Sequence, residues 1–396
     1  DLTSELVKRG HEVTVLTGKP NYPEGDVFPE FKGDSNRFSD YQGVEVIRVP
    51  MLTRGQGSLI KLLMNYLSYA ISASILGAFK LRKRKFDVIF VFEPSPITVG
   101  IPAVVIKKLK KVPVIFWVLD LWPETLKAIG AVKSNTALKV VGGLVSFIYN
   151  RCDLVLGQSR TFLTGIEKYC KDKSKIKYFP SWSEALFANK VTKNIQSISK
   201  YENDFKVLFA GNIGDAQDFS SILNAVELLK SRNINVKFFI VGDGRSLEWV
   251  KEQIIERELQ DWVVLMGRHP LEMMPDFYAS ADALLVTLKR SDIFSMTIPG
   301  KVQSYLMAGK PILAMLDGEG AYVIDESKSG LTCSSGDYEQ LVENIVKMSS
   351  LSGNELDEMA INAKQYAEKE FGRNRLVSQL EVWFQDISDH SDNLSR

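Results

Sequence analysis

The sequence predicts an α/β protein built from two doubly wound domains, in each of which helices cover both faces of a parallel sheet. Short apolar runs alternate with helical segments through both halves of the chain. In the second half several of these runs lead directly into glycines, and a polar stretch without periodicity separates the two halves. Ligands of such sheets bind beyond the carboxyl ends of the strands, so the functional site is expected there.

Five strands are predicted in each half. Those of the first half are Val13–Leu16, Val44–Val49, Val88–Phe92, Val114–Val118 and Leu154–Gly157. Those of the second half begin at Val207, Val236, Val263, Ala283 and Pro311. The predicted domain limits are therefore 1–188 and 205–370, joined by a linker over 189–204, with a helix over 371–385 and a disordered tail over 386–396.

The composition is that of a folded chain with a real core, since 45% of its 396 residues are hydrophobic. Its three cysteines, Cys152, Cys170 and Cys333, lie far apart and form no C-x-x-C pair, which indicates a reduced, cytoplasmic context. The three histidines are too scattered along the sequence to suggest a metal site.

Charge is distributed unevenly, although the whole chain carries a net charge of only +1. Residues 1–200 hold 30 Lys and Arg against 17 Asp and Glu, a net charge of +13, and residues 201–396 carry a net charge of −12. The basic residues gather in Lys80–Lys85 and Lys107–Lys111, each directly after an apolar segment. That placement favours an anionic membrane surface over nucleic acid as a partner. Two helices that simply end in cations are the alternative.

The segment Leu62–Phe79 has no charged residue in 18 positions, which is long enough to be considered as a membrane span. Polar side chains nevertheless recur at helical spacing, at Lys61, Asn65, Ser68 and Ser72, and the opposite face is apolar. The pattern predicts an amphipathic helix that lies in a membrane interface or packs on the first domain, not a span.

The segment Phe294–Leu313 gives the clearest indication of a ligand site. It reads as a Pro-Gly turn, a short helix that stops at Gly309, and a buried strand from Ile312. Thr297 and Lys301 stand at the start of that helix, where free N–H groups and the helix dipole favour an anion, usually phosphate. The carboxyl ends of other strands carry further candidates at the same edge, namely Gly211, Gly214, Asp243, Gly244 and Arg268.

Three patterns occur together in the chain: D-L-W-P-E at Asp120–Glu124, G-N-I-G-x-x-Q-D at Gly211–Asp218 and T-I-P-x-K-V-Q at Thr297–Gln303. With them the sequence resembles family 4 of the retaining glycosyltransferases, in a bacterial surface-polysaccharide subgroup that includes N-acetyl-L-fucosamine transferases. The resemblance implies the GT-B fold, two Rossmann-like domains facing a central cleft, with the acceptor on the first domain and a nucleotide sugar on the second. It also implies that a first strand and its glycine-rich loop, about twenty residues, precede the helix over 1–10.

The second domain departs from the family pattern at three places. The two glutamates of the second domain, separated by seven residues, are replaced by Ser295 and Gln303. The cations that many members carry after the first strand of that domain are absent, and Asn212 stands there. The predicted donor-binding residues are therefore Gly211, Asn212, Gly214, Gln217, Asp243, Gly244, Arg268, Thr297, Lys301 and Gln303, with Lys301 the first candidate for the phosphate clamp.

Asp120 and Glu124 are the predicted catalytic residues. They follow a buried strand at its carboxyl edge, and a family histidine near this point is replaced by Leu119. Either carboxylate could orient or deprotonate an acceptor hydroxyl, or contact the donor sugar. The alternative is that they cap the helix that begins after Pro123.

The resemblance predicts an enzyme that transfers a sugar from a UDP-sugar to a polyprenyl-diphosphate-linked saccharide acceptor in capsule or O-antigen synthesis. It would work at the inner face of the bacterial plasma membrane, with no cofactor beyond its substrate. No Asp-x-Asp triplet occurs, so no metal is expected. A UDP-sugar 2-epimerase of the same architecture and a non-catalytic nucleotide-sugar-binding partner are the alternatives.

Overall fold

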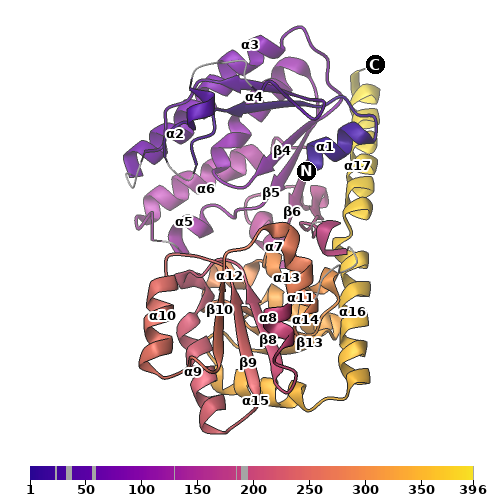
Figure 1. Cartoon of the computed structure of the whole chain (residues 1–396). Helices are drawn as coiled ribbons and strands as arrows, with labels where there is room; N and C mark the ends of the chain where they lie inside the picture. The colour runs from indigo at the N-terminus through magenta and orange to yellow at the C-terminus, as the bar shows by residue number, and fades with distance from the viewer. Residues whose placement is uncertain are drawn as a thin grey trace. The chain divides into compact units, whose positions relative to one another are not determined.

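The computed structural model describes residues 1–22, 25–32, 38–55, 59–128, 130–183, 185–188 and 195–395. The chain divides into two compact units. Unit 1 comprises 1–158, 162–179 and 377–396, and unit 2 comprises 159–161 and 180–376. Figure 1 shows the elements of both units along the chain.

Unit 1 contains a four-stranded parallel sheet in the order β4-β5-β6-β7, with bounds Ile89–Glu93, Val114–Val118, Leu154–Gly157 and Ile176–Tyr178. Its central strand β5 is buried along its whole length, as expected of an apolar run with neighbours on both sides. A separate sheet has the order β1-β3-β2, with bounds Thr14–Gly18, Val44–Val49 and Asp40–Tyr41.

The helices of this part of the chain connect and cover these strands. They are α1 (Leu2–Lys8), η1 (Pro29–Phe31), α2 (Leu59–Ser72), the π-helical turn η2 (Ala73–Gly77), α3 (Ala78–Leu81), η3 (Ile97–Val99), α4 (Gly100–Lys110), α5 (Glu124–Ala128), α6 (Asn135–Tyr149), α7 (Arg160–Glu167) and η4 (Lys173–Lys175).

Unit 2 contains one six-stranded parallel sheet in the order β10-β9-β8-β11-β12-β13. The bounds are β8 (Phe205–Ala210), β9 (Val236–Val241), β10 (Val263–Gly267), β11 (Ala283–Thr287), β12 (Ile312–Met315) and β13 (Gly330–Cys333). Numbered from the first strand of the unit, this is the order 3-2-1-4-5-6 of a dinucleotide-binding fold, whose direction of winding reverses between β8 and β11.

Helices cover both faces of this sheet, and a buried apolar cluster lies on each face. The elements are η5 (Ala185–Ala188), α8 (Gln196–Ser199), η6 (Asp215–Gln217), α9 (Phe219–Ser231), α10 (Leu247–Glu256), η7 (Leu271–Met273), α11 (Met274–Ala279), α12 (Asp292–Met296), α13 (Gly300–Ala308), α14 (Glu319–Ser327), α15 (Tyr338–Ser349) and α16 (Gly353–Phe371). The predicted architecture of doubly wound α/β units is confirmed.

Three strands were not predicted: β2, β7 and β13. Each has at most four residues and includes polar positions, so no apolar run marks it in the sequence. All three lie at the edge of a sheet, where one side of the strand is unpaired.

The last helix, α17, spans Arg373–Ser395 and includes the stretch for which a disordered tail was predicted. The sequence after Gly372 contains neither Gly nor Pro, so nothing in it ends the helix. From Val377 onward α17 belongs to unit 1, where the Trp383 ring lies 5.6 Å from that of Phe179 and Glu381 pairs with Arg9 at 2.9 Å. The predicted linker over 189–204 lies only partly in the described residues, which include α8.

Candidate functional site

The carboxyl ends of β8 and β11 mark the switch point of the sheet in unit 2, and two loops leave the sheet there. The loop after β8 runs through Gly211 and Gly214 into η6. The loop after β11 leads to α12 and then to α13. They are tied together, because the Lys289 amide donates to the Ala216 carbonyl at 2.9 Å.

Glycines allow the loops after β8 and β9 to lie backbone against backbone. Gly211 and Gly242 have φ values of +133° and +150°, in the region that side chains avoid. The Ile213 amide donates to the Asp243 carbonyl at 2.8 Å, and a Cβ on Gly244 would stand only 2.2 Å from the Ile213 carbonyl oxygen. The predicted residues Gly211, Gly214, Asp243 and Gly244 therefore form one compact surface of main chain.

Lys301 lies in the first turn of α13, and its side chain extends to this surface. Its Nζ donates to Gln217 Oε1 at 2.6 Å and stands 3.6 Å from the centre of the Phe209 ring. Its Cε would be 2.6 Å from a Cβ on Gly211. Burial lowers the pKa of Lys301 to about 7, although the ring and the amide oxygen both favour the charged form. An anion bound beside Nζ would favour that form further.

The remaining donor candidates differ in their freedom to meet a ligand. Asn212 and Arg268 are exposed, and Arg268 has no hydrogen bond or ion pair with the part of the chain that the structure describes. The Thr297 hydroxyl donates to the Phe294 carbonyl at the end of α12. Gln303 is 5% exposed and its Nε2 donates to the Ser181 carbonyl at 2.8 Å, so one of its two amide N–H groups is already engaged.

In unit 1, Asp120 follows β5 and Glu124 begins α5. Both Asp120 oxygens accept hydrogen bonds, Oδ2 from the Trp122 indole at 3.0 Å and Oδ1 from the Thr125 hydroxyl at 2.6 Å. These donors are side chains, so Asp120 orients the start of α5 without accepting from its backbone amides. Glu124 Oε1 accepts from Tyr169 at 3.2 Å, and its Oε2 is buried without a partner among the described residues.

Sequence reasoning did not identify Glu93, the last residue of β4. It is fully buried, and its Oε2 accepts from the Asp120 amide at 3.4 Å. A carboxyl group that ends the apolar run of β4 is the signal that could have found it, because such a strand end faces the same edge as Asp120.

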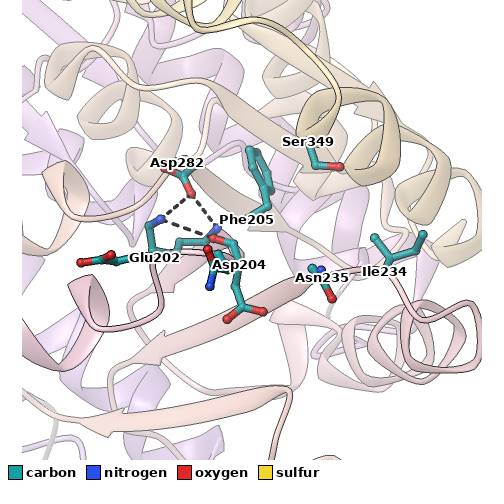
Figure 2. A pocket seen from close by; sticks show the side chains of 9 residues that line it. Glu202, Asp204, Phe205, Ile234, Asn235, Asp282 and Ser349 are labelled. Carbon is teal, nitrogen blue, oxygen red and sulfur yellow. Dashed lines mark hydrogen bonds and ion pairs between the residues drawn. The ribbon is translucent and has the colours of Figure 1, made fainter.

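Two further observations concern parts of the structure outside the predicted donor and catalytic residues. Within the described ranges no three His, Cys, Asp or Glu side chains gather as a metal site. A cavity of about 440 Å³ is lined by residues that include Asp204, Phe205 and Asn235 (Figure 2). At its edge Asp282 pairs with Lys206 at 3.0 Å. The cavity lies at the amino ends of β8, β9 and β11, the edge of the sheet opposite the switch point, so it is not the predicted donor site.

The loop Gly211–Gly214 is called the glycine turn below. The chain is a two-domain Rossmann-like protein, because a parallel sheet that carries the glycine turn and Lys301 at its switch point is joined to a second α/β unit. Residues 1–182 match the family described as glycosyl transferase 4-like domain, and residues 190–369 match glycosyl transferases group 1. The two matches together cover most of the chain, and each half is similar to one of the two domains of glycosyltransferases.

Curated relatives carry related descriptions. The chain is 28% identical over 251 residues to the probable glycosyltransferase WbjE of Pseudomonas aeruginosa, an alignment that covers 60% of this chain and 62% of that protein. It is 25% identical over 324 residues to the putative colanic acid biosynthesis glycosyl transferase WcaI of Escherichia coli, covering 78% and 76%. The chain thus spans less than two thirds of the length of the first of these relatives.

Solved structures confirm the GT-B fold. A sucrose-phosphate synthase from Thermosynechococcus elongatus superposes with a TM-score of 0.71 over 98% of this chain and 91% of its own, at 14% identity. The Anabaena protein HepE, crystallised with UDP and glucose, superposes with a TM-score of 0.66 over 95% and 100%, also at 14% identity. At such identities the likeness is one of fold alone.

Proposed function

We propose that the protein is a retaining glycosyltransferase that moves a sugar from a UDP-sugar to a polyprenyl-diphosphate-linked saccharide in capsule or O-antigen synthesis. The main support for binding of a UDP-sugar is the placement of Lys301 beside the glycine turn at the switch point. A diphosphate is bound by a cation and by main-chain amides, and Lys301 would supply the cation. The descriptions of WbjE and WcaI support the pathway class, and the sequence patterns support the N-acetyl-L-fucosamine subgroup.

Release of UDP from a panel of UDP-sugars, with and without lipid-linked acceptor, tests this proposal. Release that requires the acceptor, with retained anomeric configuration in the product, supports it. UDP release without acceptor, accompanied by a 2-epimeric sugar, would instead favour an epimerase. Binding of a UDP-sugar without any turnover would favour a non-catalytic partner, a reading that the replacement of both family glutamates keeps open.

Chelation should leave the activity essentially unchanged. In this proposal Lys301 supplies the charge that neutralises the diphosphate leaving group, so no divalent cation is required. The measurement is UDP release before and after treatment with EDTA. A loss of activity that Mg²⁺ or Mn²⁺ restores would overturn metal independence.

We also propose that unit 1 binds the inner face of the plasma membrane through α2, η2 and α3. Leu59–Leu81 is long and apolar enough to span a membrane by length and composition, yet only 17% of its apolar window is buried. Two of its polar side chains are turned to the protein, because Asn65 is 5% exposed and Ser68 Oγ accepts from the Leu52 amide at 2.9 Å, whereas Lys61 is exposed. Its apolar face, each member between 39% and 76% exposed, consists of Ile60, Leu63, Met64, Leu67, Ile71, Ile75, Leu76 and Phe79.

Such a helix is the reverse of one that packs on a soluble core, because it turns apolar side chains to the solvent and polar ones to the protein. The cations after it are suited to anionic lipid, but not all of them are free. Arg84 pairs with Glu45, and Lys80 donates to the Arg48 carbonyl. Only Arg84 is offset by a carboxylate among the described residues, so Lys80, Arg82, Lys83 and Lys85 keep their charge, each worth about 1 kcal/mol near an anionic surface.

Replacing Ile60, Leu63, Leu67, Ile71 and Ile75 with Gln should reduce sedimentation with anionic vesicles at least tenfold, because the substitution removes the side chains that enter the lipid. Gln keeps a good helix propensity, so the helix is expected to remain. Replacing Lys80, Arg82, Lys83, Arg84 and Lys85 with Gln should weaken binding mainly at low salt, because exposed charges are screened.

The matched control replaces Ile255 and Ile361 with Gln, since both are exposed apolar residues of unit 2. It should sediment as the wild type does. If the apolar-face variant still sediments like the wild type, α2 and η2 are not the membrane-binding element.

A further inference from the structure

Glu93 lies in unit 1 in an environment that does not suit a charged carboxylate. The side chain is 0% exposed, and its Oε1 has no hydrogen-bond partner in the described residues. Its hydrogen bonds come from two main-chain amides, that of Asp120, which donates to Oε2 at 3.4 Å, and that of Leu119. A buried carboxylate normally requires a cation as well, and no cation pairs with Glu93 among the described residues.

The titratable groups around Glu93 add no compensating positive charge. These groups are Asp120 at the end of β5, Glu124 of α5, Cys152 after α6 and the Tyr149 hydroxyl of α6. Asp120, Glu124 and Cys152, like Glu93, raise the pKa of the buried Tyr149, so they lie around that hydroxyl. The charged residues of α4 are lysines of its last turn, where Lys107 pairs with Asp153 at 2.5 Å. Because Asp153 also accepts from the Val114 amide, that pair lies at the amino end of β5, away from Glu93.

Burial and the negative charge of Asp120 together raise the pKa of Glu93 well above its usual range. The Tyr149 hydroxyl, whose pKa Glu93 raises, also lacks a hydrogen-bond partner among the described residues. A protonated carboxyl group brings a hydrogen-bond donor into this neighbourhood and puts no second negative charge beside Asp120.

We propose that Glu93 is a neutral carboxylic acid that acts as a positioning residue for Asp120. It fixes the main chain at Asp120 through Oε2 and lets that residue carry the single negative charge of the pair. The next step rests on the proposed glycosyl transfer. The Asp120 carboxylate takes the proton of the acceptor hydroxyl while the hydroxyl oxygen forms its bond to the sugar and the bond from the sugar to UDP breaks. Glu93 keeps its own proton throughout.

The decisive measurement compares the folding equilibrium of the full-length wild type with that of Glu93→Gln across pH. In the unfolded chain Glu93 loses its proton above about pH 4.3, whereas in the fold it keeps it, so rising pH favours unfolding of the wild type. The folding constant of the wild type should therefore fall relative to the variant by up to about tenfold per pH unit, until the folded pKa is reached. A constant difference over that range would overturn the proposal.

The control is Glu45→Gln, because Arg84 lowers the pKa of that carboxyl and the dependence on pH is reversed. Its contribution to stability should be present above about pH 4.3 and be lost as pH falls. The folding measurement needs no substrate, so it judges Glu93 even if the proposed transfer reaction is wrong.

Activity gives the second readout. Glu93→Gln should keep kcat/KM within about threefold of the wild type at neutral pH, since Gln mimics the neutral acid, and should lose the alkaline decline that ionisation of Glu93 causes. Glu93→Leu should lower kcat at least tenfold with little change in KM for the donor. A folded but inactive Glu93→Gln would show that Glu93 acts as a charged base and would overturn the proposal.

Discussion

Lys301→Ala is expected to lower donor turnover at least tenfold. The lysine is a buried cation beside the glycine turn, whereas the more exposed Lys289 is paired with Asp215, and a charge placed against a leaving diphosphate in a water-poor site is worth several kcal/mol. In the wild type, UDP affinity should also fall as pH rises from about 7 to about 9, because the pKa of Lys301 is about 7 and the charged fraction declines. Lys301→Arg, which stays charged, should lack this decline.

Steady-state kinetics and UDP titrations measure both effects, and Lys301→Met tests the loss of charge with little loss of volume. Lys251→Ala is the matched control, because it removes a surface lysine of unit 2 that pairs with Glu248. Wild-type kinetics in Lys301→Ala would place the diphosphate elsewhere, and Arg268→Ala would be examined next.

Gly242→Ala is expected to destabilise the protein by about 3 kcal/mol and to abolish UDP binding. An added Cβ would stand 1.8 Å from the Gly211 carbonyl oxygen, at a φ of +150°. Neither loop can retreat easily, since the Gly211 amide is bound to the Val241 carbonyl and the Gly242 amide to the Gly267 carbonyl. Denaturant unfolding and a UDP titration measure the two losses.

Two further glycines separate strain from steric overlap. Gly267→Ala has a φ of +74° but open space around the new methyl group, so about 1 kcal/mol is expected. Gly353→Ala has neither problem and should be neutral or slightly stabilising, because it lies in a helix. Equal stability of the Gly242 and Gly353 variants would mean that the loops after β8 and β9 do not touch in solution.

The sequence was sufficient to predict an element where its local hydrophobic pattern agrees with its place in the fold. Strands such as β5 and β11 are continuous apolar runs because parallel strands are buried on both faces. The glycine turn and Lys301 could be predicted because strand order places them at one edge of the sheet. The predicted roles of Asp120, Glu124 and the donor-binding residues remain predictions.

The rest depends on contacts between distant residues. Helical spacing separated the polar and apolar sides of α2, but it could not show which side meets the protein, because the burial of Asn65 depends on Leu52, thirteen residues earlier. Glu93 was missed for a similar reason. Its isolation arises from α6 and the end of β5, and neither is apparent from the sequence around β4.

The outward apolar face of α2–α3 has a consequence for kinetics. If that face holds the enzyme on a bilayer, enzyme and lipid-linked acceptor meet by lateral diffusion in two dimensions. The quantity that governs the encounter is then the acceptor's surface density, as in any tethered pair whose effective concentration is set by geometry. Diluting the acceptor with inert lipid would slow the reaction even when its total amount in the vessel is unchanged.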